Sequence, residues 1–238
     1  MLITADTTVA DIATAAPATI RVFQRHRIDF CCGGKVPLRQ ACTAKGLSTD
    51  QMLGELRSAT APESAERNWS DAPLTALVHH IQERYHAHLR EELPRLEAML
   101  AKVVSRHGDH MPDVLLPLQQ TFLGLQLELL AHMLKEDRVL FPLMEALDAG
   151  GPLVASNAAA RVAAPILVME AEHAVAGEAL ERMRTLTGGY APPEWACPTF
   201  RGLYYGLSQL EADMHLHVHL ENNVLFPRAV WLASRGHE

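Results

Sequence analysis

The chain has 238 residues, of which 48% are apolar and only 5% aromatic, and its formal net charge at pH 7 is -7. This length allows one sizeable core with a small additional module. A chain without a concentrated stripe of Lys and Arg is a poor partner for nucleic acid, because binding requires neutralisation of phosphates. Apolar residues recur at helical spacing, while short alternating runs bounded by turn residues are scarce. The composition therefore predicts an all-α protein.

The N-terminal residues 1–17 contain acidic residues and no basic n-region, so we expect no secretory signal. We also expect no membrane partner, because no apolar run approaches the length of a membrane span. The predicted location is the cytoplasm. Four cysteines in a chain of this length do not indicate a disulfide scaffold, and a bond between the adjacent Cys31 and Cys32 would be strained.

Residues 1–59 are predicted to form a small helical domain. Thr8 or Asp11 can cap a first helix. Pro17 can begin a second one, which we expect to end at the Cys-Cys-Gly-Gly turn of residues 31–34. The two glycines permit positive φ at such a helix end. Two further short helices are expected, over 37–45 and 48–58, and Ser48 is the expected cap of the second.

Residues 60–72 are rich in Pro, Ser, Ala and charge, which is typical of a linker. Beyond this segment, residues 73–238 are expected to form an antiparallel four-helix bundle. The four long helices are predicted over 73–107, 112–147, 165–188 and 194–234, separated by Gly and Pro turns.

One motif occurs twice in the predicted bundle. His132–Pro142 reads HMLKEDRVLFP and His217–Pro227 reads HVHLENNVLFP, so both fit H-x3-E-x2-V-L-F-P. A His and a Glu four residues apart lie on one face of a helix. Apolar residues should share or flank that face in the first copy, namely Leu125, Leu129, Val139, Leu140 and Leu143. Buried imidazoles and carboxylates need partners, and together they suit first-row metals such as iron. The predicted ligands are His132, Glu136, His217 and Glu221.

The other two long helices carry a second shared pattern. Both Glu83–His86 and Glu170–His173 read E-x2-H, which adds His86 and His173 as candidate ligands. The helices thus form two similar halves, which predicts two equivalent metal positions. Glu83 and Glu170 leave a ferritin-like ligand set open, although that pattern does not require a His four residues before each remaining Glu.

Further polar residues surround the candidate ligands. Glu128 and Asp213 each precede a motif His by four residues, and Glu172 precedes His173. We interpret these three either as groups that orient the histidines or carry ions and protons inward, or as plain surface carboxylates. Five other bundle histidines are expected to be exposed to solvent, namely His79, His80, His88, His215 and His219.

In combination, these motifs resemble a known family. DFCCGG at 29–34, RYH at 84–86, HMLKEDRVLFP, VMEAEH and HLENNVLFPR look like the di-iron repair-of-iron-centres proteins, which consist of a small N-terminal domain and a haemerythrin-like bundle. The resemblance implies two non-haem iron ions with an oxo or carboxylate bridge. It implies terminal ligation by His86, His132, His173 and His217, with Glu136 and Glu221 as bridges. It also implies repair of iron–sulfur clusters after nitrosative or oxidative damage by supply of iron, with damaged iron–sulfur proteins as partners.

Two other functions fit the same residues. A di-iron centre could reduce nitric oxide as an enzyme, or it could bind nitric oxide or dioxygen without turnover. Manganese could occupy the same ligands, and a homodimer is left open. We interpret Cys31 and Cys32 as accessible redox or transfer thiols, with a purely structural role as the alternative.

Overall fold

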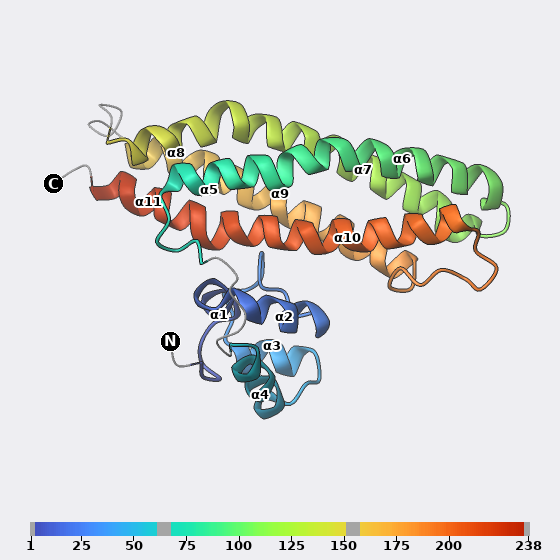
Figure 1. Ribbon diagram of the computed structural model, residues 1–238, viewed down its shortest axis with the longest axis horizontal. Coiled ribbons are helices and arrows are strands. Elements are labelled where there is room, and N and C mark those ends of the chain that lie inside the picture. Colours follow the sequence, from blue (N-terminus) through green and yellow to red (C-terminus); the bar gives the residue numbers. More distant parts are fainter. Residues whose placement is uncertain (1–2, 61–67, 151–157, 236–238) are drawn as a thin grey trace. The chain divides into compact units, whose positions relative to one another are not determined.

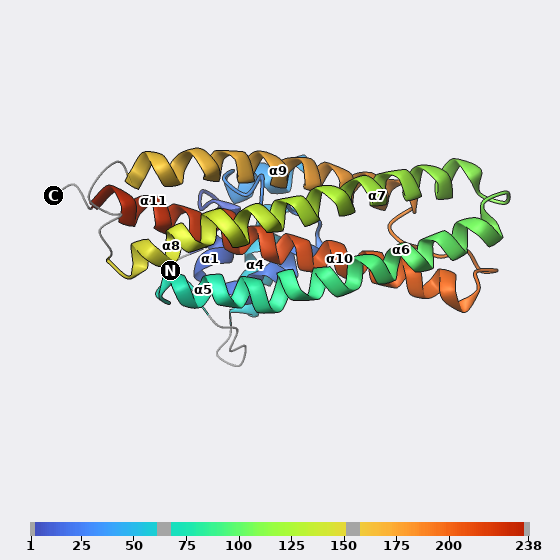
Figure 2. The same ribbon diagram turned by 90° about the horizontal axis from the view of Figure 1, so that it is seen from above.

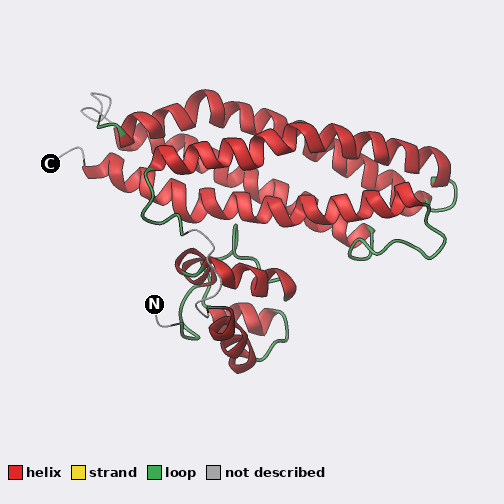
Figure 3. Ribbon diagram, viewed as in Figure 1, coloured by secondary structure: helices red, strands yellow, loops and turns green. Residues whose placement is uncertain are grey.

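The computed structural model describes residues 3–60, 68–150 and 158–235. Within these ranges every regular element is a helix, apart from an isolated bridge between Thr8 and Pro37 (Figure 3). This confirms the all-α prediction. The chain divides into two compact units, of which unit 1 comprises Met1–Leu77, Ala146–Ala160 and His215–Glu238, and unit 2 comprises Val78–Glu145 and Arg161–Met214.

The N-terminal part of unit 1 is a small helical module. Thr8 caps the first helix through a bond from the Asp11 N–H to its Oγ1 (3.1 Å), and Ser48 caps the last through the Gln51 N–H (3.4 Å). Both helices therefore begin where the caps predicted. The elements are α1 (Val9–Ala15), η1 (Pro17–Thr19), α2 (Ile20–Arg25), α3 (Leu38–Ala44) and α4 (Thr49–Ala59). Fully buried side chains form the core of the module, among them Ile12, Phe23, Leu38 and Leu56.

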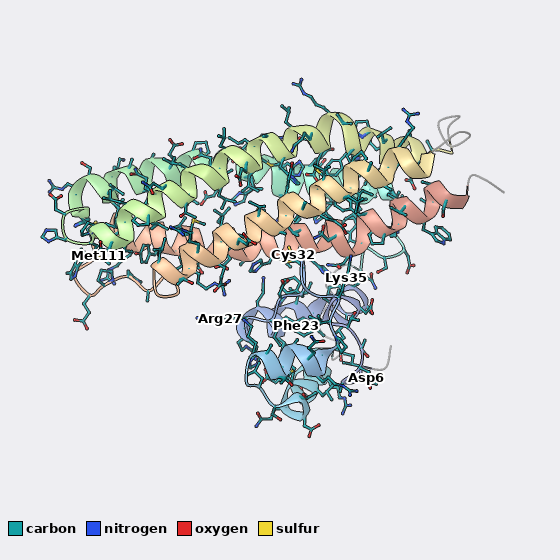
Figure 4. All side chains as sticks on the ribbon, turned by 180° about the vertical axis from the view of Figure 1, so that it is seen from behind. Asp6, Phe23, Arg27, Cys32, Lys35 and Met111 are labelled. Carbon is teal, nitrogen blue, oxygen red and sulfur yellow. The ribbon has the colours of Figure 1, made fainter. Side chains whose placement is uncertain are left out.

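The loop between α2 and α3 differs from the prediction. The second helix ends at Arg25, not at the cysteines, and Arg27 has a positive φ of 54°. Cys32 and Lys35 therefore lie on an irregular loop (Figure 4). Neither Gly33 nor Gly34 adopts positive φ; instead, a Cβ at Gly34 would lie 2.7 Å from the Phe30 carbonyl oxygen. These glycines are needed for close approach of the backbone.

Asp29 holds this loop together. Its Oδ1 accepts hydrogen bonds from the N–H groups of Cys31 (2.9 Å) and Cys32 (3.0 Å), and its Oδ2 accepts from the Gly33 N–H (2.8 Å). Three backbone donors on one carboxylate fix the chain path without any helix, since Asp readily bonds the backbone of the residues that follow it.

Four long helical runs follow the module, and their middle parts lie side by side in unit 2 (Figures 1 and 2). The first is α5 (Leu74–Ile81), η2 (Gln82–His86) and α6 (Ala87–His107), and the second is α7 (Pro112–Lys135), η3 (Glu136–Leu140) and α8 (Phe141–Asp148). The third is α9 (Ala158–Leu186), and the fourth is α10 (Pro198–Leu220), η5 (Glu221–Leu225) and α11 (Phe226–Arg235).

Two helix starts differ from the predicted ones. The third helix begins at Ala158 and carries Pro165 inside it, because an Ala-rich stretch favours helix strongly enough to outweigh the proline. The fourth begins at Pro198, since Glu194 and Trp195 form a turn. Proline at the first helical position loses no intrahelical bond.

Three π-helical segments interrupt the long helices, at η2, η3 and η5. A π turn bonds residue i to i+5 and so contains one residue more than an α turn. The apolar pattern after η3 is therefore shifted by one residue. Val139 is 54% exposed and Leu143 is half-buried, whereas Leu140 and Met144 are buried. The expectation that Val139 shares or flanks the buried face was wrong for this reason, whereas the half-buried Leu143 flanks it.

The run from Pro112 to Asp148 is long and apolar enough to cross a membrane, with a mean hydropathy of 1.2 over its most apolar window. The expectation that no run approaches this length was therefore wrong. Length and composition alone do not separate a span from a bundle helix, and this run carries the buried polar residues His132 and Glu136.

Candidate metal centre

The structure buries all six residues predicted as ligands. None is more than 4% exposed, and Glu136 and Glu221 are fully buried. The π segments coincide with them: Glu136 begins η3, Glu221 begins η5 and His86 ends η2. Single π turns are frequent at functional sites because they redirect side chains within a helix. His132, His173 and His217 lie on the regular helices α7, α9 and α10.

The ligand atoms gather into two groups that could each hold a metal ion. One group is His86, Glu136, His217 and Glu221, and the other is His132, Glu136, His173 and Glu221. Within each group the atoms lie within 4.8 Å of one another. The two-half pattern predicted two metal positions, and two groups are found. They share both glutamates, and each takes one histidine from each half of the chain. Neither Glu83 nor Glu170 joins a group, so the ferritin-like ligand set is not the one assembled.

Glu136 faces histidines of both groups. Its Oε2 lies 3.4 Å from Nε2 of His86 and 3.2 Å from Nε2 of His132. Glu136 could therefore serve a cation in either group. In the second group, the Nε2 atoms of His132 and His173 approach to 3.0 Å. Nitrogen and carboxylate donors that converge in a buried site fit first-row transition metals.

A carboxylate orients His86 from behind. Asp137 Oδ1 lies 2.9 Å from Nδ1 of His86, and Asp137 also accepts from Gln82 Nε2 (3.0 Å) and from Arg90. Burial alone would raise the pKa of Asp137, but these hydrogen bonds lower it to about 2. An ionised Asp137 accepts a hydrogen bond from the Nδ1–H of His86. This leaves the Nε2 lone pair of His86 available to a metal.

Glu172 plays the same part for His132. Its Oε2 lies 2.9 Å from Nδ1 of His132, and its Oε1 pairs with Lys135. Burial alone would raise the pKa of Glu172. The hydrogen bonds from Lys135 and His132 have the larger combined effect, so the pKa is lowered. Of the three candidate orienting carboxylates, Glu172 contacts a ligand. Glu128 is exposed, and Asp213 accepts hydrogen bonds from Arg84 at 3.3 and 3.4 Å.

Sequence reasoning missed Asp137. It directly follows Glu136, but the second copy of the motif has Asn222 at that position. The repeated motif therefore does not include this position. The available signal was the acidic pair Glu136-Asp137 beside a predicted buried ligand, since ligating histidines usually donate their other ring N–H to a carboxylate.

The second copy of the motif instead contacts the cysteine loop, within unit 1. Asn223 Nδ2 donates to the carbonyl oxygens of Phe30 (3.2 Å) and Cys31 (3.0 Å), and Nδ1 of His219 lies 3.2 Å from the Phe30 oxygen. His219 is only 2% exposed, and burial lowers its pKa to about 4. The expectation of an exposed His219 was wrong, because the loop covers it. His79 and His88 are exposed as predicted, and His80 and His215 are half-buried.

The two thiols of the loop differ. Cys31 is buried and Cys32 half-buried, and none of the four cysteines forms a disulfide. The hydrogen bond with Cys32 and then burial raise the pKa of Cys31 well above its usual value. The Cys31 thiol donates to Asp29 Oδ1 at 3.4 Å. Cys31 is therefore a neutral thiol at physiological pH, and only Cys32 is partly accessible.

Comparison with known proteins agrees with this arrangement. Residues 77–229 match the hemerythrin HHE cation binding domain, and residues 5–60 match ScdA_N, a domain of unknown function. The iron–sulfur cluster repair protein YtfE of Pectobacterium atrosepticum is 39% identical over 225 residues, covering 94% of this chain and 97% of that protein. YtfE of Cronobacter sakazakii is 39% identical and covers 94% and 96%, and YtfE of Yersinia pestis is 39% identical and covers 92% and 94%. With this identity along nearly its whole length, the chain belongs to the YtfE family of iron–sulfur cluster repair proteins and carries a hemerythrin HHE cation binding domain.

Proposed function

We propose that this protein holds two non-haem iron ions and supplies iron for the repair of iron–sulfur clusters damaged by nitrosative or oxidative stress. The observation that carries the proposal is the position of Glu136 Oε2 between Nε2 of His86 and Nε2 of His132, inside two buried groups that share both glutamates. Its relatives are named for cluster repair. Damaged iron–sulfur proteins of the cytoplasm would be the recipients.

The donor set favours iron among the common metals. Mixed imidazole and carboxylate ligation with two shared glutamates is the chemistry of di-iron carboxylate bundles. Iron bound there would supply redox chemistry and ligand exchange toward small molecules such as nitric oxide or dioxygen. Asp137 and Glu172 would keep the Nδ1 proton on His86 and His132, so that both imidazoles remain neutral ligands.

The two groups differ in their exposure to solvent. The Glu172 side chain behind His132 is 35% exposed, whereas the Asp137 side chain behind His86 is 19% exposed and His86 itself is fully buried. A carboxylate that is exposed to water is easier to displace from its histidine, or to protonate, than a buried one. We therefore propose that the ion held by His132 and His173 is the one exchanged with a recipient, and that the ion held by His86 and His217 is retained.

The test uses the full chain purified without oxygen. Metal analysis should find about two irons per chain. Incubation with a cluster-free iron–sulfur protein, sulfide and a thiol reductant should rebuild the recipient's cluster, as followed by its visible absorbance. Glu136→Ala should abolish both results.

Two other outcomes would assign a different function. Formation of nitrous oxide from nitric oxide by the reduced protein, without iron transfer, would make it a nitric oxide reductase. Stoichiometric binding of nitric oxide or dioxygen with neither reaction would make it a passive binder.

A further inference from the structure

A row of polar side chains in unit 2 leads from solvent to the buried His86. Nδ1 of His86 lies 2.9 Å from Oδ1 of Asp137, and the other oxygen of this carboxylate, Oδ2, accepts a hydrogen bond from Arg90. The exposed fraction of the side chain falls from 46% at Arg90 to 19% at Asp137 and 0% at His86. We name these three residues the first charge chain. One carboxylate thus joins a buried candidate ligand to a cation that is in contact with water.

A second charge chain, formed by Lys135, Glu172 and His132, has the same order. Oε2 of Glu172 lies 2.9 Å from Nδ1 of His132, and Oε1 of Glu172 pairs with Lys135. The exposed fractions of the side chains are 45% for Lys135, 35% for Glu172 and 5% for His132. Both chains lead to the same atom, since Oε2 of Glu136 lies 3.4 Å from Nε2 of His86 and 3.2 Å from Nε2 of His132.

The sequence builds the two charge chains in the same way. In each chain the cation follows its histidine by one helical turn, four residues from His86 to Arg90 and three from His132 to Lys135. Residues at these spacings share a helix face. The carboxylate comes from the neighbouring helix in both cases. The other histidine of each metal group is followed at these positions by Ala and Gly or by Leu and Glu, so each group contains one charge chain.

The cation in each chain does more than form a surface ion pair, which by itself contributes little to stability. The carboxylate uses one oxygen for the cation and the other for Nδ1–H of the histidine. The cation therefore fixes the plane of the carboxylate and, through it, the rotation of the imidazole ring. Without its cation, a partly exposed carboxylate such as Glu172 can turn toward water and leave the ring unsupported. The position of Nε2 then depends on a residue at the protein surface.

We propose that Arg90 and Lys135 are positioning residues, each of which sets the affinity for one of the two metal ions. Arg90 acts on the group that contains His86, and Lys135 acts on the group that contains His132. The proposal rests on the two-ion centre of the proposed function and adds a separate control of each ion from the surface of the bundle.

The two cations should not contribute equally. Asp137 also accepts a hydrogen bond from Nε2 of Gln82 (3.0 Å), and this bond remains when Arg90 is replaced. Asp137 is also less exposed than Glu172, so it has less freedom to turn toward water. Loss of Lys135 should therefore weaken the binding of its ion more than loss of Arg90 weakens the binding of the other.

Variants that hold a single ion separate the two effects. His132→Ala leaves all members of the first group in place, and His86→Ala leaves all members of the second. Cobalt(II) is the probe, and competition with a coloured chelator gives its affinity for the full chain. In the His132→Ala protein, Arg90→Gln should lower this affinity about threefold to tenfold, less than the roughly 10- to 100-fold typical of losing the carboxylate itself. Lys135→Gln should leave it unchanged there. In the His86→Ala protein, the two substitutions should exchange their effects.

Two further sets of variants separate positioning from a structural role. Arg95→Gln is the matched control, because Arg95 also lies on α6 and is 51% exposed but pairs with Glu92. It should change neither affinity. Arg90→Lys and Lys135→Arg keep the charge and should retain most of the affinity that the glutamine variants lose. Circular dichroism verifies that every variant is folded.

The same substitutions in the otherwise wild-type chain give a second measurement, in which each should weaken one of two cobalt-binding steps. Equal losses in both single-ion proteins, or no loss from either glutamine variant, would overturn the proposal. The measurement does not involve iron transfer. Two cobalt ions bound by a wild-type protein that transfers no iron would therefore refute the proposed iron supply, while selective losses would still uphold the roles of Arg90 and Lys135.

Discussion

Asp137 and Asn222 occupy the same position in the two copies of the repeated motif, yet they bind different parts of the protein. Asp137 Oδ1 lies 2.9 Å from Nδ1 of the ligand His86, whereas Asn222 Nδ2 donates to the Cys31 carbonyl oxygen at 3.4 Å. A carboxylate can only accept these bonds when ionised, while an amide can donate. One copy of the motif therefore supports a metal ligand, and the other anchors the cysteine loop.

Removal of the supporting carboxylates should weaken metal binding without removing a ligand. Asp137→Asn and Glu172→Gln keep the shape of the side chain but remove the negative charge. That charge strengthens the hydrogen bond from Nδ1–H of His86 or His132. We expect each to lower metal affinity by roughly 10- to 100-fold, as is typical of such partners. Competition with a coloured chelator measures the affinity.

Asp213→Asn is the control for that experiment, because Asp213 pairs with Arg84 on the bundle surface. The metal affinity of Asp213→Asn should match that of the wild-type protein. If Asp137→Asn binds metal as tightly as Asp213→Asn does, the orienting role of Asp137 is wrong.

The shared glutamates should matter to both ions at once. Glu221→Ala removes a member of both groups, so we expect it to lose nearly all bound iron, whereas His132→Ala removes a member of only one group. His132→Ala should therefore retain up to one iron per chain. His215→Ala, at a half-buried position outside both groups, should keep the full content. Metal analysis of the three purified variants distinguishes these outcomes, and equal loss in all three would refute the assignment.

Asn223 should hold the cysteine loop in place. Asn223→Ala removes two hydrogen bonds to the Phe30 and Cys31 carbonyl oxygens, which should cost about 1–2 kcal/mol of unfolding free energy. We expect faster hydrogen exchange in residues 28–36 with unchanged iron content. Asn68→Ala is the matched control, since the exposed Asn68 accepts a local bond from the Ser70 N–H. Unaltered exchange in Asn223→Ala would show that the loop is held by other contacts.

The two thiols should react at different rates. Because the bond with Cys32 and burial raise the pKa of Cys31, its neutral form persists in the folded protein above the unfolded value of about 8.5. Iodoacetamide at pH 8 should therefore modify Cys32 well before Cys31, as read by mass spectrometry of the peptides.

The same shift gives a pH dependence of stability. A thiol whose pKa is raised on folding contributes stability that is fully present below the unfolded pKa and is lost as pH rises through the folded one. Between pH 8 and pH 10, wild-type protein should lose more unfolding free energy than Cys31→Ser, whose hydroxyl does not ionise. A parallel decline of the two proteins would contradict the burial of a neutral thiol at this position.

The residues of the candidate site were readable from the sequence because their spacing repeats. The motif copies at His132 and His217 share both the four-residue step and the following LFP, and a helix converts that spacing into one face. The all-α fold was readable for the same reason, since apolar periodicity dominates the long helices.

What could not be read depends on contacts between distant segments. His219 is buried because a loop almost two hundred residues earlier covers it, and no local pattern encodes that contact. Asp137 supports a histidine on another helix, so its role appears only when η2 and η3 are adjacent. The predicted start of α9 at Pro165 was too late. Proline is common at the first position of a helix, but here the alanines before Pro165 favour helix strongly enough to extend it back to Ala158.

The π turn at η3 has a genetic consequence. It stores one residue more than an α turn, so removal of any single codon between 137 and 140 would let the helix continue as regular α. Phe141 and the buried residues after it would keep the faces they have now, because the extra residue is what shifts their register relative to His132. A deletion outside the π turn has no extra residue to remove, so it would rotate everything after it by about 100°. In-frame insertions and deletions are normally tolerated only in loops; here, a length change in the middle of a helix is built into the geometry of the centre.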